Sequence, residues 1–383
     1  MSRNRNILLS LALVLSVSAI AVQDVLAARP VIEVGSEAGP VRVVTIAEGL
    51  QTPWSLAFLP DGRMLVTERP GTMRIVSHSG ERSTPLVGVP EVHAQGQGGL
   101  LDVVLGPDFA ADRRIYFSYA EPTGRGARTA VARAVLDVDS LMLDEVEVIF
   151  AQSDDPPGRH HWGSRLAFAR DGTLFVTLGD RFMHRDLAQT LDNHYGKIVR
   201  INPDGTAPDD NPFVGQPEVK PEIFSYGHRN LQGAALHPES GVLWTHEHGP
   251  QGGDEVNVGK AGANYGWPII TYGREYVTGG RIGEGTERDD VEPPLHHWTP
   301  SIAPSGMAFY TGDAFPRWRG NLFVGALRGQ LLSRLELDGE RIVGEERLLT
   351  ELGSRIRDVR QGPDGGLYLL DESNGRILKL EPG

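Results

Sequence analysis

Six glycine-flanked polar clusters hold the side chains in this sequence that are best suited to chemistry. They are QGG from Gln97, HHWGSR from His160, GHRNLQG from Gly227, HEHGPQGGDE from His246, NYGWP from Asn264 and SRIRD from Ser354. Together they offer histidine as a proton acceptor, arginine and amide groups for an anionic ligand, and backbone carbonyl groups for a hard cation. Each cluster is weak by itself, because a lone histidine is usually a surface or core residue. Their combination on predicted loops favours a functional site.

His161 and Asp180 are the strongest candidates for an acid–base pair. His161 precedes a predicted hairpin, and Asp180 ends the second strand of that hairpin. The turn at Asp171-Gly172 places the two strands side by side, so we expect the two side chains to meet at one rim. A carboxylate in that place orients an imidazole and favours its charged form. His160 is an alternative base, although the spacing to the GSRL segment favours His161.

Arg355 and Arg357 form a candidate clamp for an anionic ligand. Alternate residues of a strand project from the same face, so both guanidinium groups can point to one side. Such a pair is more often a solvated strand face, but two arginines also suit the carboxylates of a flat, multiply charged ligand. The HHW segment at 296–298 is a poor metal site, because adjacent histidines on a strand face opposite sides.

One hairpin pattern recurs along the chain: a short alternating apolar strand, a turn with Asp-Gly or a similar pair, and a second apolar strand. Its six copies span 54–69, 101–119, 165–180, 232–247, 305–326 and 356–371. These repeats predict an all-β fold, a six-bladed β-propeller, whereas a β-sandwich would not repeat one hairpin in this way. We expect Val41–Ile46 to pair with C-terminal strands, because closing the ring removes open sheet edges.

The first residues of the chain and its overall composition limit which classes of protein it can belong to. The basic first residues, the apolar run 7–22 and the small side chains at 25–27 are typical of a secretion signal over 1–27. Residues 28–383 then form one propeller domain without a membrane span, periplasmic or secreted. The chain has no cysteine, so its core or a bound metal must supply stability. A net charge of −13 argues against nucleic acid and anionic membranes and favours a small-molecule partner.

Taken together, the motifs resemble the soluble PQQ-dependent glucose/sorbosone dehydrogenase family, in its aldose sugar dehydrogenase branch. The similarity runs from about Gly49 to Leu380, and its most specific pieces are GHRNLQG, EHGPQGGDE, NYGWP, PSIAPSGM and RIRDV. The resemblance implies an enzyme, expected as a monomer, that oxidises aldose sugars at the anomeric carbon to lactones. Its cofactors would be pyrroloquinoline quinone (PQQ) and Ca²⁺, with hydride passed to the quinone. An electron acceptor of unknown identity completes the expected set of partners.

The resemblance also implies roles for individual residues. His161 matches the general base, and Asp180 matches the carboxylate beside it. The positions that match PQQ contacts are Gln97, Arg229, Asn230, Gln232, Arg328, Arg355 and Arg357, with a loose register at Arg328. Arginine suits the three carboxylates of this cofactor, since its fork binds carboxylate in a bidentate manner.

Calcium ligands are implied in the same way. The backbone carbonyl groups of Gly249 and Pro250 match those that hold the cofactor's calcium. Glu255 and the carbonyl of Tyr265 resemble a second, structural calcium site of the branch. Oxygen-only ligands are what this hard cation prefers. Three aromatic residues either line the sugar pocket or pack inside blades: Trp162, Trp298 and Tyr276.

Two other functions fit a six-bladed propeller. A calcium-dependent lactonase needs a carboxylate-rich calcium cage at the channel centre, whereas the conspicuous residues here are arginine, glutamine and histidine. A non-catalytic binding propeller does not require His161, Asp180 and the arginine pair together. The connections between blades are shorter than in the glucose enzymes of the resembled family, which predicts an open pocket and a broad range of sugars.

Overall fold

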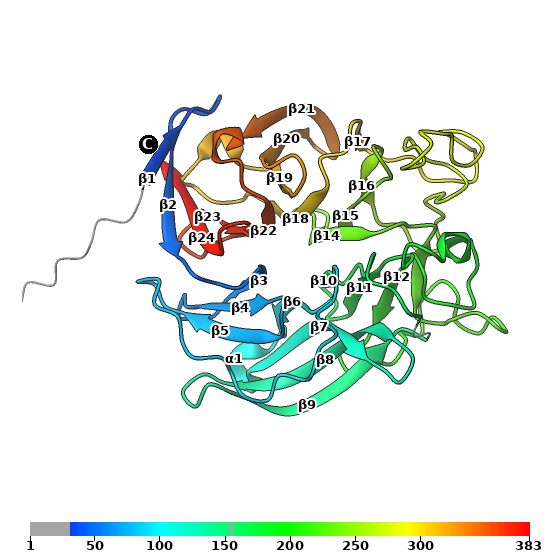
Figure 1. The fold of residues 1–383 in the computed structure, drawn as a ribbon, viewed down its shortest axis with the longest axis horizontal. Coiled ribbons are helices and arrows are strands. Elements are labelled where there is room, and N and C mark those ends of the chain that lie inside the picture. The colour runs from blue at the N-terminus through cyan, green and yellow to red at the C-terminus, as the bar shows by residue number, and fades with distance from the viewer. Residues whose placement is uncertain (1–30, 154–155) are drawn as a thin grey trace, which may run out of the picture.

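Six sheets surround a common centre in the computed structural model (Figure 1): one of five strands, four of four and one of three. The structure describes residues 31–153 and 156–383, and the predicted secretion signal at 1–27 lies outside them. No helix within the described ranges is long and apolar enough to cross a membrane. The all-β, six-bladed propeller predicted from the repeats is confirmed.

Each repeated hairpin forms the two innermost strands of one blade. The pairs are β3 (Pro53–Phe58) with β4 (Met64–Glu68), β6 (Leu100–Leu105) with β7 (Arg114–Pro122), β10 (Leu166–Phe168) with β11 (Leu174–Leu178), β14 (Leu231–Leu236) with β15 (Leu243–Glu247), β18 (Pro304–Phe309) with β19 (Leu322–Ala326), and β22 (Ile356–Gln361) with β23 (Leu367–Asp371). The innermost strands of neighbouring blades contact one another around a central channel. Period-two alternation of apolar side chains and a turn between the strands account for the hairpin in every blade.

Outer strands complete the blades. They are β5 (Thr72–Val76), β8 (Ala127–Asp137), β9 (Met142–Ala151), β12 (Lys197–Ile201), β13 (Ile223–Tyr226), β16 (Asp254–Val258), β17 (His296–Trp298), β20 (Leu332–Asp338) and β21 (Arg341–Leu348). Short helical turns lie in the connections: α1 (Phe109–Asp112), η1 (Arg185–Gln189), η2 (Pro316–Trp318) and η3 (Thr350–Leu352). The longest connections are 259–295 between β16 and β17, 77–99 between β5 and β6, and 202–222 between β12 and β13, so two of the three lie within a blade.

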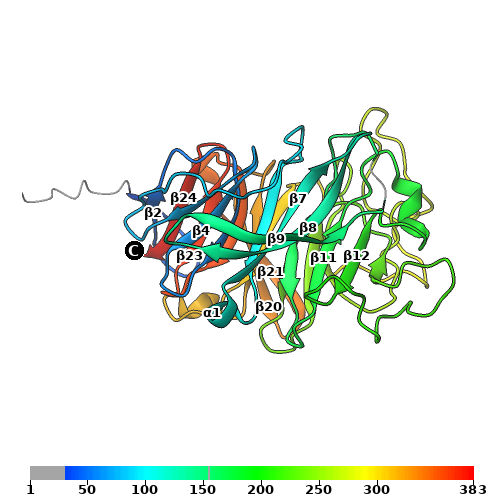
Figure 2. The same cartoon turned by 90° about the horizontal axis from the view of Figure 1, so that it is seen from below.

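Strands from both ends of the described chain close the ring. β2 (Val41–Ala47) pairs antiparallel with β24 (Arg376–Pro382), and β1 (Val31–Val34) extends the same sheet. Figure 2 shows β2 beside β24 at one end of the molecule. The pairing expected for Val41–Ile46 is confirmed, and it fastens the first and last parts of the propeller to each other.

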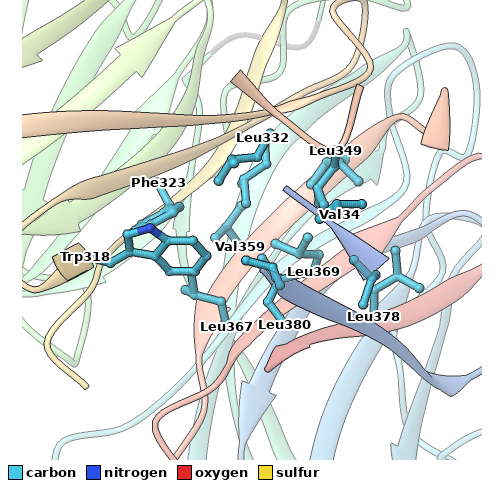
Figure 3. Close-up of a cluster of buried hydrophobic side chains, with 14 of the residues drawn as sticks. Val34, Trp318, Phe323, Leu332, Leu349, Val359, Leu367, Leu369, Leu378 and Leu380 are labelled. Carbon is cyan, nitrogen blue, oxygen red and sulfur yellow. The ribbon is translucent and has the colours of Figure 1, made fainter. Parts of the chain in front are cut away.

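Apolar side chains fill the space between neighbouring blades. β4, β11 and β19 are buried along their whole length, because each blade packs against a neighbour on both of its faces. Figure 3 shows one such cluster, in which Trp318 and Phe323 of the fifth blade lie with Leu367 and Leu369 of the sixth. These clusters hold the six inner strands at the spacing that the functional loops require.

Charged side chains cross the central channel. Arg165, just before β10, donates through Nη1 to Asp358 Oδ1 at 2.8 Å. Arg360 donates to Asp358 at 2.8 Å and to Asp102 at 2.9 Å. Both carboxylates are buried. Asp358 Oδ2 also accepts from a backbone N–H of β3, and Asp102 Oδ2 accepts from a backbone N–H of β10. Two cations therefore balance two anions, and the network joins the inner strands of four blades.

Replacing Arg165 with methionine is expected to lower the free energy of unfolding by about 3–5 kcal/mol, because two buried carboxylates lose a partner. Chemical denaturation followed by tryptophan fluorescence measures the change. Arg341→Met is the matched control, since Arg341 forms an exposed ion pair with Asp338. Its loss is expected to cost less than about 1 kcal/mol. Equal stability of the two variants would contradict a central role for the channel network.

Candidate active site

His161 and Asp180 meet at one rim of the propeller. His161 lies ahead of β10 and Asp180 follows β11, so adjacent strands of one blade bring them together. The distance from His161 Nδ1 to Asp180 Oδ1 is 2.6 Å, and both side chains are buried. His160 is exposed, and no side-chain hydrogen bond joins it to Asp180 in the described part of the chain. The contact expected between His161 and Asp180 is present, and His161 rather than its neighbour makes it.

Three donors bind the carboxylate of Asp180. Its Oδ1 accepts from His161 Nδ1 and from the backbone N–H of Phe182 at 2.8 Å. Its Oδ2 accepts from Trp267 Nε1, also at 2.8 Å. With Nδ1 donating to this ionised carboxylate, Nε2 carries the lone pair of the neutral imidazole. Trp267 had no assigned role in the sequence analysis, although the NYGWP motif contains it.

The backbone around His161 is tightly constrained. His161 has φ of +53°, an uncommon value for a residue with a side chain, and its N–H donates to Gln97 Oε1 at 2.7 Å. Gly179 lies directly against the same segment: a Cβ there would stand 2.2 Å from the carbonyl oxygen of His161. Only glycine fits that approach, so the sequence Gly179-Asp180 is needed to bring the carboxylate to the ring.

Burial lowers the pKa of His161 to about 4. The positive charge of Arg229 acts in the same direction, while Asp180 opposes both through its charge and hydrogen bond. The carboxylate does favour the charged imidazole, as its position next to the ring predicts, but desolvation outweighs it. At neutral pH the ring is therefore uncharged and able to accept a proton.

Five of the predicted cofactor contacts line one small cavity beside His161. The cavity has a volume of about 70 Å³ and is lined by Gln97, Asn230, Gln232, Arg355 and Arg357 together with Trp54, Leu101, Trp162, Gly163, His248 and Leu327. A pocket of about 310 Å³ is lined by His161, Asp180 and Arg229 with Phe182, Pro250, Trp267 and Tyr276 among others. Consecutive residues of the same loops line both spaces, so the cavity and the pocket lie next to each other.

Two of the three predicted aromatic residues lie at these spaces. Trp162 lines the cavity and Tyr276 lines the pocket. Trp298 does not: it is buried in β17, and its Nε1 donates to Glu345 at 3.0 Å. The pocket-lining alternative for Trp298 is therefore wrong, because its strand lies at the outside of its blade. Arg328 is exposed in the turn after β19 and lines neither space.

Buried guanidinium groups leave unsatisfied donors at the site. The Nε atoms of Arg229 and Arg357 are buried without a hydrogen-bond partner among the described residues. The other nitrogens are held in place: Arg229 donates to His248 O at 2.8 Å and to the Tyr276 hydroxyl at 3.1 Å. Arg357 donates to Gln232 Oε1 at 3.2 Å. Unpaired, oriented arginine donors fit the carboxylates of an anionic cofactor.

Glu372 is a site residue that the sequence analysis missed. Its carboxylate binds both arginines of the clamp, Arg355 Nε at 3.0 Å and Arg357 Nη2 at 2.9 Å. Burial opposes ionisation, but the two guanidinium groups prevail and lower the pKa of Glu372 to about 2. The signal that was available is the acidic residue that often ends the second strand of the repeat. Here that end reads Asp371-Glu372, and the second of the two faces the clamp.

The Gly249-Pro250 loop is held by Asp254. The N–H of Gly249 donates to Asp254 Oδ1 at 2.9 Å, and Asp254 also accepts from the N–H groups of Ile302 and Ala303. The carbonyl of Pro250 accepts from a backbone N–H of a neighbouring loop, which leaves a second lone pair for a cation. A hard ion with oxygen ligands therefore fits this loop. Asp254 fixes the loop's direction and was not predicted.

Glu255 and Tyr265, the candidates for the structural calcium site, lie together. Both line a cavity of about 670 Å³ at the outer part of the fourth blade. Within residues 31–153 and 156–383, no three histidine or acidic side chains converge as a metal site, so backbone carbonyls have to complete any calcium shell.

The chain is similar to known proteins over most of its length. Residues 50–379 match the family described as glucose/sorbosone dehydrogenase. Over 347 residues the chain is 46% identical to aldose sugar dehydrogenase YliI of Escherichia coli, covering 89% of this chain and 93% of that protein. The apo-form structure of the soluble aldose sugar dehydrogenase from Escherichia coli has a TM-score of 0.87 at 46% identity, covering 90% of this chain and 100% of that one. The PQQ-bound form of aldose sugar dehydrogenase from Streptomyces coelicolor has a TM-score of 0.74 at 31% identity, covering 92% and 99%.

Glu372→Gln is expected to strengthen PQQ binding about tenfold in protein stripped of cofactor. The amide keeps one acceptor for the clamp, but it removes a negative charge that competes with the cofactor's carboxylates. Fluorescence titration with PQQ measures the affinity. Arg355→Ala is the matched control and is expected to weaken binding about tenfold or more. Weaker binding in both variants would show that Glu372 only positions the arginines.

Proposed function

The chain belongs to the glucose/sorbosone dehydrogenase family, and from this premise we propose that it is a quinoprotein aldose sugar dehydrogenase. It oxidises aldoses at the anomeric carbon to lactones, with PQQ and Ca²⁺ as cofactors. The observation that carries the proposal is the buried His161–Asp180 pair at a pocket next to an arginine-lined cavity. A panel of sugars, tested with PQQ, calcium and a dye as electron acceptor, gives the direct test.

The sugar binds in the pocket of about 310 Å³. Nε2 of His161 takes the proton from the anomeric hydroxyl, because Nδ1 is committed to Asp180. The carboxylate fixes the ring orientation and stabilises the imidazolium that forms. Trp267 and the backbone of Phe182 keep Asp180 in place during this step.

Residues of the cavity and of the adjoining pocket would together hold PQQ. Arg355, Arg357 and Arg229 supply donors for its carboxylates, and Gln97, Asn230 and Gln232 supply amide contacts. The carbonyls of Gly249 and Pro250 would hold the cofactor's calcium, and Arg328 is a cofactor contact only if its turn moves inward. Bound PQQ supplies the acceptor for the hydrogen and electron pair that leave the anomeric carbon, and calcium makes it a better acceptor.

Glu255 and the carbonyl of Tyr265 are proposed as a structural calcium site at the outer part of the fourth blade. The protein is further proposed to act as a monomer, outside the cytoplasm, after cleavage of residues 1–27. Size-exclusion chromatography with light scattering and N-terminal sequencing of the exported protein test these points.

The lactonase alternative is less well supported. It needs carboxylates that are free to bind calcium in the channel, but Asp102 and Asp358 are already bound by Arg165 and Arg360. A purely binding propeller gives no reason for a buried imidazole that donates to a buried carboxylate with two further donors. Neither alternative accounts for the unpaired donors of Arg229 at the pocket and Arg357 at the cavity.

His161→Ala is expected to reduce sugar turnover by about 10²–10⁴, the usual contribution of a general base, while PQQ affinity stays within about threefold. His160→Ala is the matched control and is expected to be nearly fully active, since His160 makes no side-chain hydrogen bond to Asp180 in the described structure. Asp180→Asn is expected to lie between them. Steady-state kinetics and PQQ titration measure all three, and an inactive His160 variant beside an active His161 variant would shift the base by one position.

The same base sets the expected pH dependence. Because the pKa of His161 is lowered to about 4, the neutral ring persists as pH falls through 6.5 and is lost near pH 4. kcat/KM is therefore expected to stay level between pH 8 and about pH 5 and to fall below that range. A fall centred near pH 6.5 would contradict the buried, neutral base.

Removing calcium with a chelator is expected to abolish dye reduction, because calcium makes the bound cofactor a better acceptor. Adding calcium with PQQ is expected to restore it, because the backbone carbonyls of Gly249 and Pro250 remain in place to bind the ion. Pro250→Ala is expected to retain most of the activity, since it keeps the carbonyl. Magnesium is the control cation, as its smaller octahedral shell suits this loop less well. Full activity in metal-free protein would contradict a catalytic calcium.

A further inference from the structure

Lys197 carries a buried amino group to which the proposed reaction gives no role. It is the first residue of β12, and it is the one lysine that is fully buried in the described ranges. Its Nζ donates to the backbone carbonyls of Leu187 and Ala188, each at 3.1 Å, and to that of Tyr195. No acidic side chain in the described part of the chain forms an ion pair with it. A buried cation without a counter-ion is costly unless it is hydrogen-bonded, so the three carbonyls indicate a task for this group.

Two of these carbonyls belong to η1. Leu187 and Ala188 lie near the end of this short helical turn, where carbonyl groups have no partner further along the turn. Backbone N–H groups of neighbouring segments also bind both carbonyls. The third carbonyl, that of Tyr195, lies on the segment that leads into β12. The amino group of Lys197 therefore fastens the end of η1 to the start of β12.

Gln189, the last residue of η1, connects the turn to the loop that carries Trp267. Its amide nitrogen donates to Asn264 Oδ1 at 3.0 Å and to the carbonyl of Trp267 at 2.8 Å. Its amide oxygen accepts from Asn264 Nδ2 at 2.9 Å. Ala188 packs against Trp267 in the same buried cluster. Because Ala188 also binds Lys197 and directly precedes Gln189, a shift of η1 would move both contacts of Trp267.

Trp267 transmits this constraint to the reaction centre. Its Nε1 donates to Asp180 Oδ2 at 2.8 Å, and Oδ1 of the same carboxylate binds His161 Nδ1 at 2.6 Å. Lys197 itself lies outside the lining of both the pocket and the cavity. The described contacts therefore form one continuous path from a buried amino group to the proposed base, and its members before Trp267 touch neither sugar nor cofactor.

We propose that Lys197 is a positioning residue for the sugar oxidation. Its amino group holds η1, Gln189 holds the loop of Trp267, and the indole holds the carboxylate that orients His161. The inference rests on the proposed function of the site. Because the path ends at the base and not at a sugar contact, its loss acts on turnover more than on sugar binding.

Lys197→Met tests the path, because it removes the amino group and keeps an apolar stem of similar length. Measurements at pH 6 keep the native amino group charged, since burial lowers the pKa of Lys197 to about 7. In enzyme loaded with PQQ and calcium, kcat is expected to fall about tenfold, while the KM for the aldose stays within about threefold. Lys379→Met is the matched control with native kcat, because Lys379 forms its ion pairs with Asp364 and Glu381 in the sixth blade.

Two further variants separate the path from general loss of stability. Gln189→Met is expected to lower kcat by a similar factor, and the double variant with Lys197→Met to fall within about twofold of the single variants, since both act on one path. Lys197→Gln keeps two N–H donors without the charge and is expected to lie between Lys197→Met and the native enzyme. It also takes the place of Lys197→Met if that variant does not fold.

Trp267 gives a readout that needs neither cofactor nor sugar. The chain has six tryptophans, so labelling with 5-fluorotryptophan gives a small set of ¹⁹F resonances, and Trp267→Phe identifies one of them. Lys197→Met and Gln189→Met are each expected to move the resonance of Trp267 and to leave that of Trp318, in the fifth blade, in place. Lys379→Met is expected to leave the resonance of Trp267 unchanged.

Four results would overturn the inference. They are native kcat in folded Lys197→Met, an unmoved Trp267 resonance in that variant, losses that multiply in the double variant, and failure of both Lys197 variants to fold, which would assign the residue to stability alone. Absence of sugar oxidation by the loaded native enzyme would instead contradict the proposed function. The resonance of Trp267, measured without cofactor, would still show whether Lys197 positions the indole, so the two failures are distinguishable.

Discussion

The charge network across the central channel is the interaction on which the rest of the structure depends. Arg165 binds Asp358 within it, and its remaining nitrogens bind the carbonyl oxygens of Gln232 and Arg357, each at 2.9 Å. Those two residues line the cavity beside His161. The same guanidinium therefore links the channel network to the backbone of two residues that line the cavity. Separating one partner of a buried ion pair leaves an uncompensated charge and costs several kcal/mol, roughly. The network therefore permits little movement of the inner strands.

The proposed base depends on a balance between burial and pairing. Asp180 stabilises a charged His161, yet desolvation is the larger effect and the ring is neutral at working pH. An exposed histidine with the same partner would be partly protonated and a poorer acceptor. The positive backbone φ of His161 and the glycine at 179 show that the chain accepts local strain to place the ring there.

The cavity and the pocket beside His161 divide into regions of different chemistry. Arginines and amides gather at the cavity, the acid–base pair lies at the adjoining pocket, and apolar side chains surround its mouth. A propeller permits this division because each blade contributes its loops independently to one face. Glu372 binds both arginines of the clamp, so it holds their guanidinium groups in place and its charge competes with that of an anionic ligand.

The sequence alone determined the features that arise from pairing of strands close together in the chain. Alternation and turn residues predicted each inner hairpin, the closing strand β2 and the meeting of His161 with Asp180, because all follow from local pairing of strands. Only the tertiary structure decided contacts between blades: Trp267 on Asp180, the channel network of Arg165, and the burial of Trp298 away from the site. The joining of Arg355 and Arg357 through Glu372 likewise needed the structure. Strand periodicity predicts which face of a strand a side chain occupies. The packing of the blades decides how deeply that side chain is buried and which residue it contacts. Burial and these contacts also set the pKa of His161.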